Sequence, residues 1–144
     1  MQEIINNAVM HVYLLCAAIL VIKMMFVTAT TGIGRIVNKS YITPEDYNWT
    51  GHDARGQNEF VERMRRIHQN DLETVLPFLA IGFLWALTEP SYTLAAWLFG
   101  LFTVTRVAHT FCYMFSLQPW RTVAFVCNEV IVWLIPILLL IAIL

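Results

Sequence analysis

Four apolar segments, each close to the length of a membrane-spanning helix, constrain this chain more than any other feature. A helix that crosses a hydrocarbon layer of about 30 Å needs about 20 residues. The first run is interrupted only by Lys23, and the second is apolar from Thr74 to Thr88, although its helical pattern begins upstream near Glu59. The predicted spans cover residues 8–34, 60–88, 92–117 and 122–144. The chain is therefore predicted to be an all-α integral membrane protein.

Composition agrees with this prediction. Hydrophobic residues make up 58% of the chain and charged residues only 13%, with a mean hydropathy of +0.63. Soluble domains carry about a quarter charged residues. The net charge of −1 argues against a nucleic-acid partner, which requires an excess of Lys and Arg. Cys16, Cys112 and Cys127 lie in apolar runs without CxxC spacing, so we expect buried thiols.

The lengths of the links between spans predict the topology. TEPS (88–91) and SLQPW (116–120) are short, which makes the helices they join antiparallel neighbours. We therefore expect an up-down four-helix bundle that forms a single domain over residues 1–144. The one long link is residues 35–59. Together with the start of the next helix, up to residue 66, it holds six Lys and Arg side chains, and Arg121 just before the fourth span adds another. By the positive-inside rule, this link and Arg121 face the cytoplasm and both termini lie on the other side.

Polar residues of all four predicted helices gather on that cytoplasmic face. Arg35 ends the first helix, Arg121 opens the fourth, and the stretch ERMRRIHQNDLE (62–73) enters the second. Within the stretch, Arg66, Asn70 and Glu73 are spaced i, i+4, i+7, which places them on one stripe. On the third helix, the residues spaced i, i+3, i+7 are Arg106, His109 and Tyr113. The convergence predicts a polar binding site at one membrane face.

Part of the 62–73 stretch also has a purely structural interpretation. Glu62, Arg63 and Asp71 are expected to join a solvated ladder of ion pairs along the helix. A metal site built from His68, Asp71 and Glu73 is not expected, because neither the HxxD spacing nor three flanking arginines favours a cation.

Three charged residues lie deep in the predicted spans. Arg106 is about ten residues, or roughly 15 Å, inside its span, where a charge costs at least about 2.5 kcal/mol. It is expected to face a polar cavity or, as an alternative, to pair with a carboxylate on another helix. Lys23 and Glu129 are predicted to form an ion pair within the bundle or between subunits.

The residue types at the polar face indicate the ligand. Arginine forks bind carboxylates in a bidentate manner, and a glutamate among them suits an ammonium or amide donor. A small zwitterion with surplus negative charge fits this set, and glutathione matches it. A thiol near Arg121 would be favoured as the reactive thiolate, at about 1.4 kcal/mol for each unit of pKa depression. The adjacent apolar cleft would hold a lipophilic electrophile.

Four segments resemble the MAPEG family, the membrane-associated proteins in eicosanoid and glutathione metabolism. They are VERMRRIHQNDLETVLPFLAIGFLW (61–85), TRVAHTFCY (105–113), PED (44–46) and QPWR (118–121). The resemblance covers nearly the whole chain, including the number and spacing of the spans. It implies a homotrimer of four-helix subunits, with glutathione held between adjacent subunits near the cytoplasmic face.

The resemblance also implies the site residues. The glutathione contacts fall on Arg35, Arg65, Arg66, His68, Asn70, Glu73, His109, Tyr113 and Arg121. Arg121 would stabilise the thiolate, Thr122 would donate a hydrogen bond to the sulfur, and Asp46 matches an acid proposed to assist catalysis. Two positions depart from the prostaglandin-synthase pattern of the family: Gln69 stands where that pattern has arginine, and Phe125 where it has tyrosine.

Three functions are compatible with this pattern. The leading hypothesis is a glutathione transferase, also able to act as a glutathione peroxidase, whose second substrate is a lipophilic electrophile or lipid hydroperoxide. The alternative is a glutathione-dependent isomerase that converts prostaglandin H2 to E2, and a third is a non-catalytic lipid-presenting membrane protein. The expected location is the endoplasmic reticulum membrane in a eukaryote or the inner membrane in a bacterium, in contact with membrane lipid.

Overall fold

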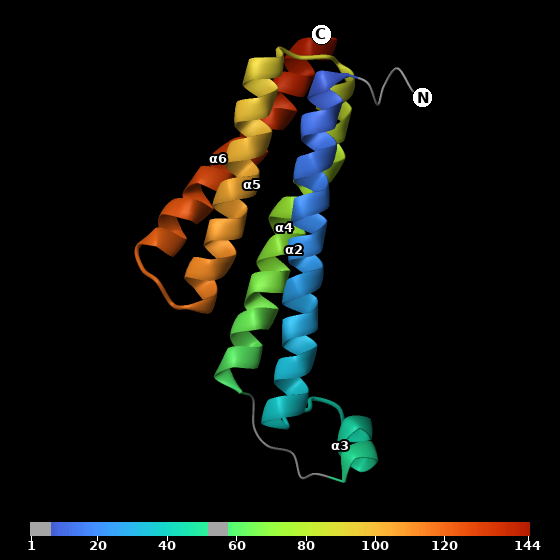
Figure 1. The fold of residues 1–144 in the computed structure, drawn as a ribbon, viewed down its shortest axis with the longest axis vertical. Helices are drawn as coiled ribbons and strands as arrows, with labels where there is room; N and C mark the ends of the chain where they lie inside the picture. The colour runs from blue at the N-terminus through green and yellow to red at the C-terminus, as the bar shows by residue number, and fades with distance from the viewer. Residues whose placement is uncertain (1–6, 52–57) are drawn as a thin grey trace.

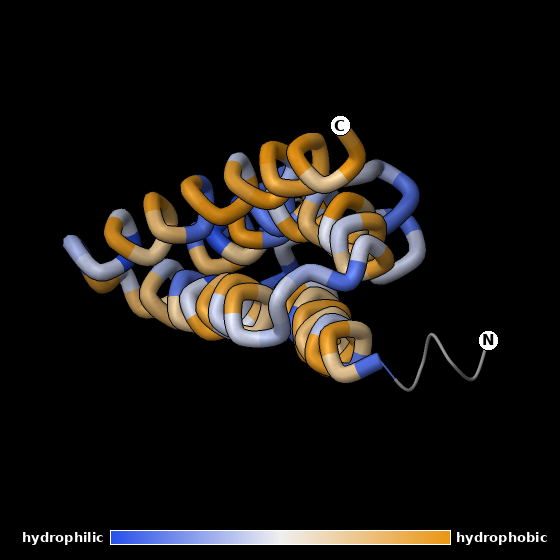
Figure 2. Tube along the Cα trace, turned by 90° about the horizontal axis from the view of Figure 1, so that it is seen from above, coloured by the Kyte–Doolittle hydropathy of each residue, from blue (hydrophilic) through white to orange (hydrophobic). Residues whose placement is uncertain are grey.

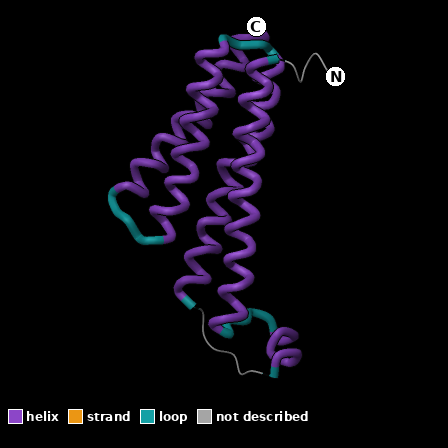
Figure 3. Tube along the Cα trace, viewed as in Figure 1, coloured by secondary structure: helices purple, strands orange, loops and turns teal. Residues whose placement is uncertain are grey.

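Helices account for nearly all of the chain that the computed structural model describes, residues 7–51 and 58–144, and these ranges contain no strand (Figures 1 and 3). The helices are α2 (Ala8–Asn38), α3 (Pro44–Thr50), α4 (Glu59–Leu87), α5 (Tyr92–Met114) and α6 (Trp120–Ile143). All but the short α3 are long and apolar enough to cross a membrane. The predicted all-α, four-span fold is confirmed. Part of the predicted long loop, residues 52–57, lies outside the described residues.

Capping groups determine where the first two long helices begin and end. Asn7 and Asn58 precede α2 and α4, and each side-chain oxygen accepts hydrogen bonds from two backbone N–H groups of the first turn. The helix α2 continues beyond the predicted residue 34 and ends at Asn38. The next residue, Lys39, forms the C-cap in a left-handed conformation with φ of 52°. This extension carries Arg35 on a helical turn instead of in a loop.

Unequal helix lengths give the bundle a projecting end. The helix α2 runs beside α4 and α5 beside α6, with α2 also packed on α5 and α4 on α6 (Figure 1). The first pair has 31 and 29 residues and the second 23 and 24. At 1.5 Å per residue, α2 and α4 reach about 45 Å and α5 and α6 about 35 Å. The longer pair extends past the α5–α6 turn toward α3, and we call this the α3 end (Figure 1).

The outer surface of the bundle is apolar, as expected for contact with lipid. Hydrophobic residues occur around the helices rather than only between them (Figure 2). Ile22, Val104 and Trp133, on three different helices, are each about two-thirds exposed. Apolar side chains left exposed on this scale mark a membrane or interaction surface.

Aromatic packing forms the core away from the α3 end. The rings of Phe78 and Phe102 stack with centroids 4.0 Å apart, which joins α4 to α5. The Tyr13 hydroxyl of α2 donates a hydrogen bond to the Leu79 carbonyl of α4 at 2.6 Å. Gly82 permits this approach, because a Cβ atom there would lie 3.3 Å from the Tyr13 ring. The helices α2, α4 and α5 therefore approach closely along this part of the bundle.

A buried ion centre links the same three helices closer to the α3 end. Lys23 of α2 and Arg106 of α5 both donate to Oδ1 of Asp71 on α4, with the Arg106 Nε at 3.2 Å. Arg106 Nη2 also donates to the backbone oxygen and to Oδ1 of Asn70, each at 2.6 Å. The side chains of Asp71 and Arg106 are 0% exposed. Each of the three charged groups thus makes at least one hydrogen bond, although Asp71 Oδ2 and Arg106 Nη1 are buried without a partner among the described residues.

The ion centre corrects two predictions. Asp71 is not part of a solvated ladder, because it is fully buried between helices. Lys23 pairs with Asp71 instead of Glu129, since Asp71 lies on the neighbouring helix α4 and Glu129 is on α6. The alternative for Arg106, a carboxylate partner on another helix, is confirmed.

Replacement of Asp71 by Asn should destabilise the bundle strongly. The change leaves two buried cations without their shared carboxylate, a loss of about 3–5 kcal/mol. Glu59→Gln is the matched control, because the Glu59 carboxylate is 79% exposed and its pair with Arg63 contributes about 0–1 kcal/mol. Unfolding of the purified protein in detergent would measure both. Equal stability of the two variants would contradict the role of the ion centre.

Candidate functional site

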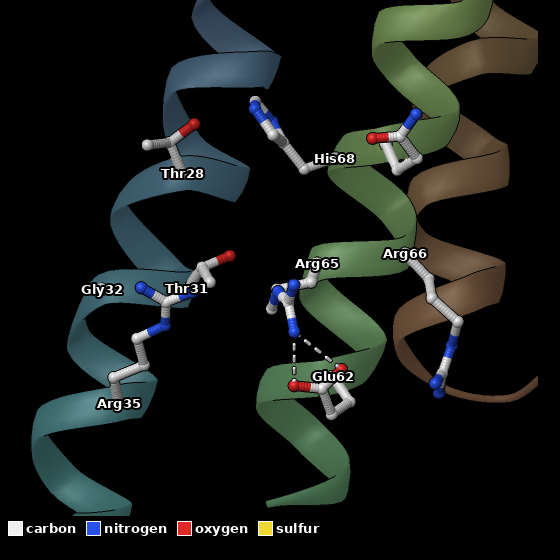
Figure 4. Close-up of a pocket in the computed structure, with 9 residues that line it drawn as sticks. Thr28, Thr31, Gly32, Arg35, Glu62, Arg65, Arg66 and His68 are labelled. Carbon is white, nitrogen blue, oxygen red and sulfur yellow. Dashed lines mark hydrogen bonds and ion pairs between the residues drawn. The ribbon is translucent and has the colours of Figure 1, made fainter. Parts of the chain in front are cut away.

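A cavity of about 540 Å³ lies between α2 and α4 at the α3 end (Figure 4). Its volume is in the range of small-molecule sites. Its lining consists of Thr28, Thr31, Gly32 and Arg35 of α2 with Glu62, Arg65, Arg66, His68 and Gln69 of α4. Four of the predicted glutathione contacts are among these residues. The lining comes from α2 and α4 alone, at a level where α4 also contacts the end of α5 through Arg63.

The cationic groups of the cavity point in different directions. Arg35 and Arg65 extend toward the space between the helices, His68 points toward α2, and the Arg66 guanidinium is directed away from α2 (Figure 4). Arg65 Nη1 donates to both Glu62 oxygens, at 2.9 and 3.1 Å. The Arg35 Nε and His68 Nδ1 atoms are buried and have no hydrogen-bond partner among the described residues. Such atoms can bind the polar groups of a ligand.

The other cation of the 62–73 stretch has a structural role. Arg63 donates to Glu59 at 2.6 Å, to the Met114 carbonyl at 3.3 Å and to the Ser116 hydroxyl. The first of these bonds belongs to the predicted surface ladder, and the other two hold the end of α5 against α4. The ladder prediction is thus confirmed for Arg63.

A second cluster forms between α5 and α6. The guanidinium carbon of Arg121 lies 4.6 Å from the centroid of the Tyr113 ring, a cation–π contact. The His109 ring packs edge-on against Tyr113 with centroids 5.7 Å apart, and Phe125 lies 6.2 Å from His109. These contacts place the Arg121 charge beside an aromatic wall on the α5–α6 side of the bundle.

Gln118 holds the polar groups of this cluster. In the amide orientation that satisfies both neighbours, its oxygen accepts from Arg121 Nε at 3.0 Å and Nη2 at 2.7 Å, and its nitrogen donates to Thr122 Oγ1 at 3.1 Å. Sequence reasoning did not single out Gln118, although the QPWR motif contains it. The link brings the two predicted groups for thiol chemistry, Arg121 and Thr122, onto one polar network.

Three of the predicted site residues lie outside both groups, although Glu73 is hydrogen-bonded to Gln69 of the cavity lining. Asn70 accepts from Arg106 and so belongs to the edge of the ion centre. Glu73 is exposed on α4 and accepts from Gln69 Nε2 at 3.0 Å. Asp46 is exposed on α3, beyond the end of the bundle (Figure 1).

Within one chain the predicted residues form two partial sites instead of one pocket. We call the group on α2 and α4 the carboxylate side and the group on α5 and α6 the thiol side. The lining of the cavity on the carboxylate side includes no residue of α5 or α6. Among the described residues, no group of three potential metal ligands occurs. The arrangement can bind an anion on one side and stabilise a developing negative charge on the other.

Nearly the whole chain is similar to a known family of proteins. Residues 13–144 match the family described as "MAPEG family". "Microsomal glutathione S-transferase 1" of Mus musculus is 38% identical over 131 residues, which cover 87% of this chain and 84% of that protein. "Prostaglandin E synthase" is 38% identical over 125 residues in Bos taurus and 37% over 124 in Homo sapiens. Each of these two alignments covers 85% of this chain and 82% of the relative.

Substitution of Arg35 or Arg65 by Gln should weaken glutathione binding by about tenfold or more. This factor corresponds to the free energy of one lost hydrogen bond to a charged group. Arg63→Gln should have little effect on affinity, because its guanidinium faces the α5–α6 turn. Isothermal titration calorimetry of the purified protein with glutathione measures all three variants. Unchanged affinity in both cavity variants would exclude the cavity as the binding site.

Proposed function

The chain belongs to the MAPEG family, and we propose that it is a membrane-bound glutathione transferase. The observation that carries this proposal is the cavity of the carboxylate side, in which Arg35, Arg65 and His68 surround a space suited to a small peptide. Guanidinium forks would bind the two carboxylates of glutathione, and a glutamate such as Glu62 would accept its ammonium group. No metal is required for this binding.

Arg121 is proposed to activate the glutathione thiol. Its guanidinium is positioned by the Tyr113 ring and by Gln118, and a fixed cation beside the sulfur favours the thiolate. The Thr122 hydroxyl would donate a further hydrogen bond to the sulfur. In the transfer, the sulfur–carbon bond forms as the leaving group departs with its electron pair, and the thiol proton passes to water.

Lipid hydroperoxides are a second proposed substrate class for the same thiolate. Attack on the outer peroxide oxygen releases the lipid alcohol, and a second glutathione then completes reduction to the disulfide and water. Both reactions need a polar nucleophile and a lipophilic partner at one place. A site at the end of membrane-spanning helices, next to an apolar surface, meets that need.

A homotrimer is proposed to complete the site. The carboxylate side and the thiol side lie on different helix pairs of one chain, and each lacks what the other supplies. In a closed ring of identical subunits, the thiol side of one copy meets the carboxylate side of the next at every interface. Asn70, Glu73 and Asp46 are proposed to join the site from the same interface.

The location is part of the proposal. Among the described residues, four helices are able to span a membrane, and the transferase relatives are named as microsomal. We place a eukaryotic form in the endoplasmic reticulum membrane and a bacterial form in the inner membrane. The α3 end would face the cytoplasm, where glutathione is available, because the positively charged link lies there.

Prostaglandin E synthase activity is the second candidate, and the similar identity to proteins of that name favours it. The residues Gln69 and Phe125 argue for the transferase, because both depart from the synthase pattern. An isomerase would not consume glutathione. Loss of free thiol equal to the product formed would support the transferase, and product formation from prostaglandin H2 with no loss of thiol would support the synthase.

Arg121→Ala should reduce the conjugation of glutathione to a chloronitrobenzene-type acceptor by about 10²–10³-fold, the typical effect of removing one group that stabilises developing charge. Arg121→Lys retains the positive charge but replaces the planar guanidinium by an ammonium group, so it should keep part of the rate. Steady-state kinetics and the ultraviolet absorption of the bound thiolate are the measurements. A wild-type rate in Arg121→Ala would overturn the role assigned to this residue.

Mixed trimers test whether two copies share one site. Arg35→Ala and Arg121→Ala subunits, each impaired alone when assayed at a glutathione concentration below the KM of the Arg35 variant, should regain activity when they are unfolded and reassembled together. In random mixtures about a quarter of the interfaces would combine two intact sides. If both sides belonged to one chain, every site would remain defective and the mixture would stay inactive.

A further inference from the structure

Glu129 is a carboxylate in the middle of a membrane-spanning helix. It lies nine positions after Trp120, the first residue of α6, which is about 13 Å along the helix. The side chain is partly exposed and lines a groove of about 470 Å³. The remaining lining of the groove is apolar and consists of Phe125, Val126, Val130, Trp133, Leu134 and Ile137.

Within the described residues, the Glu129 carboxylate has no hydrogen bond or ion pair. Lys23, its predicted partner, is bound to Asp71. Arg106 attracts Glu129 electrostatically; its Nε and Nη2 atoms donate to Asp71 and Asn70, and its buried Nη1 atom has no hydrogen-bond partner among the described residues. The ion centre holds two cations and one anion, and the carboxylates of Glu129 and Glu73 both attract Arg106 electrostatically. The excess positive charge of the ion centre favours a carboxylate at this position of α6. The exposed part of the Glu129 side chain faces the groove.

The groove continues from the thiol side of the candidate site. Phe125 belongs to both, since it lines the groove and lies 6.2 Å from His109. Arg121, Phe125, Glu129 and Trp133 are spaced i, i+4 along α6 and form one stripe. Glu129 is eight residues from Arg121, about 12 Å along the helix axis. A lipophilic molecule whose reacting atom is at Arg121 can thus extend along the stripe to Glu129.

We propose that Glu129 selects the lipophilic second substrate, favouring molecules that carry a hydroxyl or other hydrogen-bond donor about 12 Å from the reacting atom and rejecting those with a carboxylate there. The proposal rests on the transferase function. An ionised carboxylate only accepts hydrogen bonds, so a donor pairs with it and a second carboxylate is repelled. The apolar walls strengthen both effects, because they lower the local dielectric around the carboxylate.

The test uses acceptors with the same chloronitrobenzene-type reacting group and a tether of about 12 Å that ends in either a hydroxyl or a carboxylate. The wild-type protein should prefer the hydroxyl acceptor by at least about tenfold in kcat/KM. In Glu129→Gln, which has the same size but no charge, the ratio should fall by about tenfold. Glu89→Gln, in the α4–α5 turn, should retain the wild-type ratio, and the untethered acceptor should react equally in all three proteins.

Each other outcome has a separate meaning. If the untethered acceptor reacts but the wild-type protein does not discriminate between the tethered pair, the inference is wrong and the transferase function stands. If no acceptor reacts, the transferase function is wrong and the inference fails with it. If Glu129→Gln alters the oligomeric mass but not the ratio, Glu129 faces another copy of the chain, which also overturns the inference.

A tether series in the wild-type protein keeps the test independent of the folding of any variant. The preference for the hydroxyl should appear at about 12 Å and disappear in tethers of half that length, because the shorter acceptor ends beside Phe125. A preference that does not depend on tether length would contradict the assignment to Glu129.

Discussion

Three charged side chains buried between helices, Lys23, Asp71 and Arg106, determine how this bundle is assembled. In a membrane, apolar side chains do not by themselves select a partner helix, because lipid tails are equally apolar. A buried charge is different. Burial of any one of these charged groups without a partner would cost free energy, and the ion pairs between them offset that cost. Asp71 accepts from both α2 and α5 and thereby sets the axial positions of these helices relative to α4. The neighbouring Asn70 is bound to the same centre, so the turn of α4 next to the candidate site is held in place by it.

The candidate site follows from that axial alignment combined with unequal helix lengths. The longer pair, α2 and α4, encloses a cationic cavity near the α3 end, and the shorter pair places Arg121 against Tyr113. A thiol peptide and a lipophilic acceptor come from different phases, and the end of a membrane-spanning bundle is where both are within reach. In the proposed homotrimer, the separation of the carboxylate side from the thiol side would divide one site between two copies. The groove lined by Glu129 runs from the thiol side along α6 into the membrane, where the lipophilic acceptor would lie.

Much of the fold and part of the site could be predicted, for different reasons. Span number follows from hydrophobic length, which depends only on local composition. The gathering of Arg35 with the 62–73 stretch follows from the topology of adjacent antiparallel helices. The partners of individual charges were harder to predict. Asp71 was expected in solvent and Lys23 beside Glu129, because helical spacing gives the face of a residue but not the rotation of that helix within the bundle. Gln118 was missed because a single amide in a short link has no periodic pattern.

The amino-acid sequence by itself determined the class of the protein, the number of its spans, its family and the set of polar residues available for chemistry. These properties depend on residue identity and on spacing along one helix, both of which are readable in one dimension. Only the tertiary structure decided which charges neutralise one another and which remain available for a ligand. It assigned Asp71 to the core and left Glu129 facing a groove, because the pairing of charges depends on distances between helices that no spacing along the chain specifies.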